Sequence, residues 1–250
     1  MKPTTRYVLS STGLVVFLLF WEGFARSGIM EPHLLPPPST IPLALISEIN
    51  EGFWQVMVWS SLRHYTIGFV LGSVLGVTLG VVVALFPRVE ASQAYLARIL
   101  RPIPPLAWIP FAIIWFGITE TAAAFIISIG IFWINYFTAM GAVKAVDKDL
   151  IEVARAFGHR TFPALLRKVI LPGAAPGILS GLRAGLGQGW MTVVAAELFG
   201  IQGIGQRMIE AAGLLNTEVV ILYMFSIAFL YGVSDYVFVR IQQRILAWQR

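Results

Sequence analysis

The sequence predicts an all-α protein that crosses a membrane several times, and its composition is the first observation in support. Of its 250 residues, 57% are hydrophobic and only 12% are charged, and the mean hydropathy is +0.77. A water-soluble domain needs far more polar surface than this to cover its exterior. We therefore expect lipid to cover most of the surface, with residues 1–250 forming a single transmembrane domain.

Span length is the second observation, because a helix needs about 20 mostly apolar residues to cross a bilayer. The first apolar segment follows Lys2 and Arg6 and lacks a small-residue cleavage pattern, so we interpret it as an uncleaved helix rather than a signal peptide. The predicted spans cover approximately residues 7–25, 62–86, 102–118, 120–142, 170–198 and 217–239.

The distribution of positive charge is the third observation, and it predicts that both termini are cytoplasmic. With the N-terminus inside, 14 of the 18 Lys and Arg residues fall in inner segments, as the positive-inside rule requires. The polar loop at residues 144–169 then also lies in the cytoplasm. These inner residues are Lys2, Arg6, Arg88, Arg98, Arg101, Lys144, Lys148, Arg155, Arg160, Arg167, Lys168, Arg240, Arg244 and Arg250.

The outer loop after the first span is rich in proline. Residues 31–42 read EPHLLPPPSTIP, and consecutive prolines favour an extended conformation over a helix. After them, Ser39 is expected to cap a short amphipathic helix that runs to about Trp59 along the outer membrane surface.

Two predicted spans carry glycine at every fourth position, which places the glycines of each span on one helix face. Such a face lets another helix approach closely, and it serves either static packing or sliding between two packed states. The row in the second span is Gly68, Gly72, Gly76 and Gly80, and the row in the fifth span includes Gly177, Gly181, Gly185 and Gly189.

The third span begins with four prolines in nine residues, in the segment RPIPPLAWIP from Arg101 to Pro110. A regular helix cannot form there, so the unpaired backbone groups must lie at the membrane interface or line a cavity enclosed by protein. A broken span of this kind is typical of a transporter.

Four charged residues fall within the spans, where charge is costly, about 2.5–3.5 kcal/mol at the bilayer centre. Glu22, Glu197 and Asp235 are near span ends, where we expect them to reach headgroups or water. Arg183 lies deeper, and either contacts an anion, pairs with a gating residue, or binds backbone carbonyls of a neighbouring helix. The candidate substrate path comprises Arg183, Gln188, Trp190, Thr192 and Glu197.

The loop at 144–169 has the pattern of a short amphipathic helix. Asp147 and Asp149 are acidic residues at its expected start, and Gly158 is a glycine at its expected end. The apolar positions follow the helical spacing i, i+3, i+4, i+7. They suit a shallow groove on a cytoplasmic partner; the alternative is a surface-lying loop without a partner. These apolar positions are Leu150, Val153, Ala154 and Phe157.

Several functions are disfavoured by what the sequence lacks. Without cysteine, and with three widely spaced histidines, a built-in metal site is not expected. No phosphate-binding loop is present, so ATP hydrolysis by that route requires another subunit, and no HExxH or GxSxG motif indicates an intramembrane enzyme. The basic pI of about 9.7 reflects topology rather than nucleic-acid binding. An ion-driven secondary transporter or channel is the main alternative, although no inverted repeat supports it.

A resemblance narrows the choice. EVARAFG (152–158) followed by VILPG (169–173) resembles the EAA motif of binding-protein-dependent ABC importer permeases, which docks into the ATPase subunit. Val153 replaces the first alanine of the motif, and the gap from Gly158 to Leu171-Pro172 departs by about one residue. The segments LLPPPSTIP, RPIPPLAWIPFAIIWFGI and ILPGAAPGILSGLRAGLGQGWMTVVAAEL are similar to the nitrate/sulfonate/taurine/bicarbonate branch, nearest to its taurine and aliphatic-sulfonate members.

The resemblance implies the type I importer architecture and a set of partners. It implies a permease homodimer in a bacterial inner membrane, two ATPase subunits that hold ATP and Mg, and a periplasmic or lipid-anchored solute-binding protein. It implies a small anionic solute and no cofactor bound by this chain. The residues implied to dock on the ATPase are Leu150, Glu152, Val153, Ala154, Phe157 and Gly158.

Overall fold

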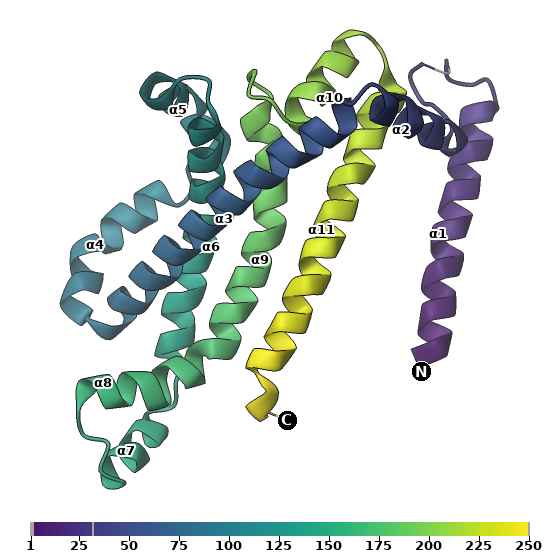
Figure 1. Ribbon diagram of the computed structural model, residues 1–250. Helices are drawn as coiled ribbons and strands as arrows, with labels where there is room; N and C mark the ends of the chain where they lie inside the picture. The colour runs from purple at the N-terminus through teal and green to yellow at the C-terminus, as the bar shows by residue number, and fades with distance from the viewer. Residues whose placement is uncertain (1–2, 32, 250) are drawn as a thin grey trace.

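The computed structural model describes residues 3–31 and 33–249, nearly all of them helical (Figure 1). Lys2, Pro32, Arg250 and the side chain of Arg6, which enter the predictions above, lie outside this description. The elements are α1 (Pro3–Arg26), η1 (Pro38–Thr40), α2 (Ile41–Asn50), α3 (Phe53–Leu85), α4 (Pro87–Leu100), η2 (Pro105–Trp108), α5 (Ile109–Phe116), α6 (Glu120–Lys144), α7 (Lys148–Ala156), α8 (Phe162–Leu165), η3 (Leu166–Ile170), α9 (Leu171–Glu197), α10 (Ile204–Gly213), α11 (Thr217–Ile245) and η4 (Ala247–Gln249).

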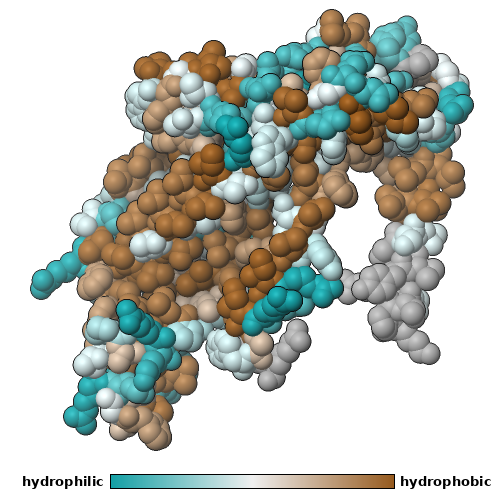
Figure 2. Space-filling view, viewed as in Figure 1, coloured by the Kyte–Doolittle hydropathy of each residue, from teal (hydrophilic) through white to brown (hydrophobic). Residues whose placement is uncertain are grey.

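The long helices connect two ends of the molecule. One end carries α7, α8 and both ends of the chain, and the other carries α2 and α10 (Figure 1). Apolar side chains cover much of the sides, whereas hydrophilic ones gather mainly towards the two ends (Figure 2). This distribution suits a protein whose sides face lipid, since helices satisfy their own backbone hydrogen bonds there.

Four helical units of the described chain are long and apolar enough to cross a membrane, and they coincide with four predicted spans. These units are α3, α6, the continuous stretch from α8 to α9, and α11. Compared with the predicted 62–86, α3 starts earlier, at Phe53. The 24-residue α1 coincides with the predicted first span, 7–25.

The third predicted span, 102–118, is broken in the structure. Its helical part runs only from Pro105 to Phe116, which at 1.5 Å per residue is about 18 Å and too short to cross a bilayer. Together with α4 it forms a pair bent by 91°, as in a broken span or a re-entrant loop. Prolines at the bend prevent a continuous helix, so the predicted count of six spans is approximate.

The outer loop differs from the prediction. Ser39 does not cap a helix; its N–H and its hydroxyl both donate to the carboxylate of Glu22, at 3.1 and 2.9 Å. Thr40 precedes α2, which ends at Asn50 rather than reaching Trp59, because Gly52 takes a left-handed φ of +80° and α3 begins after it. The expected single helix is therefore two helices with a glycine turn between them.

The glycine row of α3 packs against α6. A Cβ atom on Gly68 would lie 2.6 Å from Cβ of Ile127, and one on Gly76 would lie 2.6 Å from the carbonyl oxygen of Phe132. Gly72 is equally tight against the backbone of α6. The close approach predicted from the glycine spacing therefore occurs between these two helices.

The glycine row of α9 packs against the same helix. A Cβ on Gly177 would lie 2.6 Å from Cβ of Ala142, and one on Gly189 would lie 2.9 Å from Cδ1 of Ile131. Gly181 and Gly185 contact Thr138 and Asn135 of α6 in the same way. As a result α6 is held between two glycine rows.

We expect Gly76→Ala to destabilise the protein, because its new methyl group would press on a backbone carbonyl that has no rotamer to change. Overpacking of this kind costs about 1–3 kcal/mol. The thermal unfolding midpoint in detergent should fall by several degrees. Gly141→Ala is the matched control, since a Cβ there meets nothing within 4 Å. Equal midpoints for the two variants would contradict tight packing of the α3 row on α6.

Candidate coupling surface and membrane-buried polar sites

The predicted cytoplasmic helix is present as α7, and its two ends are built as the sequence indicates. At the start, the Asp147 carboxylate accepts a hydrogen bond of 2.9 Å from the N–H of Asp149. At the end, Gly158 has a φ of +91° and His159 donates its N–H to the carbonyl of Ala154 at 3.0 Å. Gly158 is thus required for the turn that ends the helix.

One apolar face of α7 is open. The exposed fractions of Leu150, Val153 and Phe157 are 54%, 52% and 81%, whereas Ala154 is buried, at 9%. Glu152 is exposed as well, and it makes no ion pair with any residue that the structure describes. The side chains predicted to dock on a partner therefore point outward, with the exception of Ala154, which packs against the chain itself.

The opposite face of α7 is joined to two spans. Ile151 packs on a cluster formed by Val143 of α6, Ile170 of η3 and Ala174 of α9. Between α8 and α9, the segment η3 is a π-helical turn. Pro172 follows it closely and has no N–H to donate, which favours such a widened turn. A displacement of α7 would consequently be passed to α6 and α9.

Arg183 is paired with a carboxylate. Its Nε and Nη2 atoms donate to Oδ1 and Oδ2 of Asp235 at 2.7 and 2.8 Å, which joins α9 to α11. Of the three alternatives for Arg183, the structure shows pairing with another charged residue and no bond to backbone carbonyls among the described residues, and Asp235 contacts Arg183 rather than being left to headgroups or water. A bidentate pair of this kind has the geometry that guanidinium and carboxylate groups prefer.

We expect Arg183→Ala to reduce transport more than it reduces protein abundance, because the pair joins α9 to α11 and its loss would change how these two spans are held together. Exchanging the charges, Arg183→Asp with Asp235→Arg, should recover part of the lost activity. The loss of transport in Arg183→Ala and its recovery in the charge-exchanged variant are both measured as uptake normalised to the amount of protein in the membrane. Activity and abundance that fall in proportion would instead assign the pair to folding alone.

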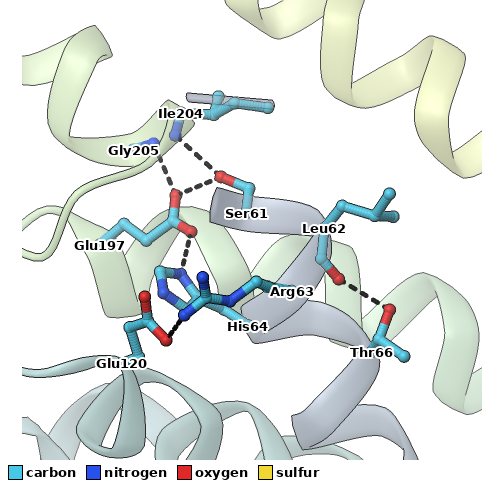
Figure 3. A network of polar contacts seen from close by, with 9 residues as sticks. All are labelled: Ser61, Leu62, Arg63, His64, Thr66, Glu120, Glu197, Ile204 and Gly205. Atoms are coloured by element: carbon cyan, nitrogen blue, oxygen red, sulfur yellow. Dashed lines mark hydrogen bonds and ion pairs between the residues drawn. The ribbon is translucent and has the colours of Figure 1, made fainter. Parts of the chain in front are cut away.

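Glu197 lies in a buried polar cluster rather than near headgroups, so the expectation that it reaches water is wrong (Figure 3). Its Oε2 accepts hydrogen bonds from the Ser61 hydroxyl at 2.8 Å and from the N–H of Gly205 at 2.9 Å. Its Oε1 lies 2.9 Å from Nδ1 of His64. Ser61 in turn accepts from the N–H of Ile204 at 2.8 Å. The cluster thus ties α3 and α9 to the start of α10.

A second polar cluster holds the other side of α10. Arg207 donates to both carboxylate oxygens of Glu48 on α2, at 2.6 and 3.2 Å, and the Tyr223 hydroxyl of α11 donates to the same carboxylate at 2.8 Å. The hydrogen bonds from Glu48 raise the pKa of Arg207 above its ordinary value. Residue spacing alone did not indicate either cluster, because each joins residues far apart in the sequence.

The five residues of the predicted substrate path are not brought together. Arg183 and Glu197 belong to the separate contacts just described. Trp190 is buried and stacks on Tyr65 with ring centroids 4.3 Å apart. Gln188 lines a cavity at the break between α4 and η2, and its side-chain N–H group lies 3.5 Å from the buried Thr192 hydroxyl. Across the described residues, no group of three or more His, Asp and Glu is placed to bind a metal.

Known proteins resemble this chain over most of its length. The family model described as "Binding-protein-dependent transport system inner membrane component" matches residues 72–249. The taurine transport system permease protein of Escherichia coli is 34% identical, over 98% of this chain and 92% of that protein. A putative aliphatic sulfonates transport permease protein of Escherichia coli is 35% identical, over 86% of this chain and 82% of that protein.

A solved structure shares the fold. A chain of the MetNI methionine ABC transporter in an inward-facing conformation aligns with a TM-score of 0.69 and 22% identity, covering 79% of this chain and 98% of that chain. The relatives are membrane components of transport systems rather than enzymes, and this chain is likewise a transport component. It belongs to the family of binding-protein-dependent transport system inner membrane components, in the branch of ABC importer permeases that contains the taurine, aliphatic sulfonate and bicarbonate proteins.

Proposed function

We propose that this chain is the membrane subunit of an importer that carries small organic sulfonates of the taurine type across a bacterial inner membrane. The observation that carries the proposal is the capped helix α7 with an open apolar face. Its exposed Leu150, Val153 and Phe157 offer a small apolar surface, and Glu152 adds an unpaired charge beside it. A separate ATPase subunit that holds ATP and Mg is the occupant we assign to this face.

The proposed mechanism transmits ATPase motion through α7. Two copies of the chain would form a dimer, with one α7 docked in each ATPase subunit. ATP binding would draw the two α7 helices together, and the contact of Ile151 with Ile170 and Ala174 would pass that motion to α9. The glycine rows around α6 provide close surfaces along which spans can shift between two packings.

The proposed class of solute, small organic sulfonates, rests on the relatives of this branch and on the negative charge of such solutes. Taurine and aliphatic sulfonates are named for two relatives more than 30% identical to this chain. Nitrate and bicarbonate are the rival anions, and a solute-binding protein on the outer side would do most of the selection. In this arrangement α7 and both termini are on the cytoplasmic side, as the positive charges predict.

Reconstitution tests the proposal. Proteoliposomes that contain the chain, its ATPase subunit and its solute-binding protein should accumulate radiolabelled taurine when ATP is supplied. Unlabelled sulfonates should compete, whereas nitrate and bicarbonate should not. Collapse of ion gradients by ionophores should leave uptake unchanged. Uptake that needs an ion gradient but no ATP would overturn the proposal in favour of a secondary transporter.

A further inference from the structure

A cavity of about 310 Å³ lies where α4 breaks, between η2, α6 and α9. Arg101, Thr138 and Gln188 are among the residues that line it, and each comes from a different part of the fold. The sequence placed Arg101 with the inner, cytoplasmic charges. In the structure it shares its cavity with Ile129 to Thr138, which form the middle of the 25-residue α6. The Arg101 guanidinium lies over Phe137, seven residues before the end of α6 at Lys144, so the side chain is placed against a spanning helix.

In the described part of the chain, Arg101 lacks the carboxylate partner that three other arginines near the spans have. Arg63, Arg183 and Arg207 each have a carboxylate partner. Within the residues described, Arg101 has none; its guanidinium lies over the ring of Phe137, 4.5 Å from the centroid. An ionised side chain at membrane depth needs a partner or water, and it commonly marks an ion or solute pathway. Because Arg101 lies beside a cavity and has no carboxylate partner among the described residues, it is suited to bind an anion transiently.

Gly130 lets α6 pack closely against α9 and η2 at one wall of the cavity. A Cβ atom on Gly130 would lie 2.7 Å from the Thr192 hydroxyl oxygen and 3.2 Å from Cγ of Pro105. The prolines at the bend stop α4 from continuing as a helix across this space. The Gln188 amide is held only by a long contact of 3.5 Å to Thr192, so it can turn to donate to a ligand.

A second cavity, of about 520 Å³, adjoins the first and shares Arg101 and Phe137 with it. It is also lined by Arg98 and Glu90, and Glu90 pairs with Lys144 at the end of α6 nearest α7. An anion that moves from Arg101 towards the Lys144 end of α6 would therefore meet a second positive charge, that of Arg98, before it reaches the surface. The two cavities together form a stepped, positively charged route along α6.

We propose that Arg101 and Gln188 form a binding site for the sulfonate group of the solute as it passes through the membrane, with Arg101 as the charged contact. A planar guanidinium donates to two oxygens of an oxyanion at once, and an amide adds a third donor. The volume suits a molecule of a few heavy atoms rather than a large ligand. This inference rests on the proposed import of a small anion, and it names the contact that such a solute makes within this chain.

The first test uses transport by the assembled complex. Arg101→Gln should lower the rate of sulfonate uptake at least about tenfold, measured per amount of assembled complex. Arg101→Lys, which keeps the charge, should recover most of the uptake. Arg88→Gln is the matched control, since it removes an exposed charge from the other end of α4 and lines neither cavity. Uptake by Arg101→Gln equal to that of the wild type would overturn the site.

The second test needs no transport and exploits the absence of cysteine from the chain. Ile134→Cys places a thiol in the cavity wall, and Gly141→Cys is a control on the same helix outside the cavity. The ratio of labelling rates, anionic sulfonatoethyl methanethiosulfonate over its trimethylammonium analogue, should be higher for the cavity thiol than for the Gly141→Cys control, and taurine should slow labelling of the cavity thiol. Arg101→Gln should abolish that charge preference. A preference that survives Arg101→Gln would overturn the site.

The two tests separate the site from the proposed function. If the wild-type complex imports no sulfonate, the proposed substrate is wrong, yet the labelling preference for anions still decides whether Arg101 binds them. If the wild type imports sulfonate but Arg101→Gln does so equally, the substrate is right and the site is wrong. If Arg101→Gln fails to assemble, the labelling rates of Ile134→Cys in the otherwise wild-type chain decide: a ratio of the two rates equal to that of Gly141→Cys would overturn the site.

Discussion

Glu152→Lys and Gly158→Pro should each abolish ATP-driven uptake while the protein still inserts in the membrane. Glu152 is exposed beside the open face of α7, so reversing its charge changes the docking surface without disturbing the fold. Gly158 has a φ of +91°, which proline cannot adopt, and its N–H donates to the carbonyl of Arg155 at 3.1 Å. Proline there would destroy the end of the helix and displace Phe157.

The measurement is uptake together with solute-stimulated ATPase activity of the co-purified complex. We expect both to fall to background, with the ATPase subunit lost from the complex or no longer stimulated. Glu51→Lys is the matched control, since Glu51 is an exposed carboxylate near the opposite end of the molecule. Its uptake should match the wild type. Normal uptake by both α7 variants would remove α7 from the coupling mechanism.

Glu197→Ala should cause the largest loss of stability among these variants. The carboxylate is fully buried and accepts from the Ser61 hydroxyl and the Gly205 N–H, and it lies against His64. Alanine would leave those three groups buried without their partner, and breaking a buried ionic or hydrogen-bonded cluster costs about 3–5 kcal/mol. The unfolding midpoint in detergent should drop strongly, and limited proteolysis should cut first near α10.

A graded series sharpens this prediction. Glu197→Gln keeps the shape and one acceptor oxygen but presents an NH₂ group to donors, so we expect an intermediate loss. Glu210→Ala is the control, because the Glu210 side chain is 46% exposed and lies 3.6 Å from Arg207. Its midpoint should stay within a degree or two of the wild type. A Glu197→Ala midpoint as high as that of the control would show that the buried cluster contributes little.

The features that local sequence determines were predicted well. The four clear spans follow from apolar length, and α7 follows from its acidic start, its helical spacing and its terminal glycine. Each of these signals is local in the sequence. Apolar length acts through the transfer of side chains to lipid, whereas the acidic start and the terminal glycine act through the backbone geometry at the ends of the helix. The glycine rows were predicted as close-packing faces for the same reason, although their shared partner, α6, was not.

The polar contacts could not be predicted in the same way. Glu197 meets Ser61 and His64 across more than 130 positions of sequence, and no periodicity reports such a meeting. Arg183 offered a partial signal, since a mid-span cation demands a partner, but the sequence did not identify Asp235 as that partner. Arg101 was counted with the inner charges, and the sequence did not indicate the two cavities that it lines.

The arrangement of α6 between two glycine rows also bears on how the chain is made. A ribosome delivers α3 first, α6 next and α9 last, so each flat glycine face becomes available beside a helix that is already present or arrives next. The α3–α6 pair can form before α9 leaves the ribosome, and α9 then finds the remaining side of α6 free. The order of synthesis therefore allows α6 to pair first with α3 and then with α9.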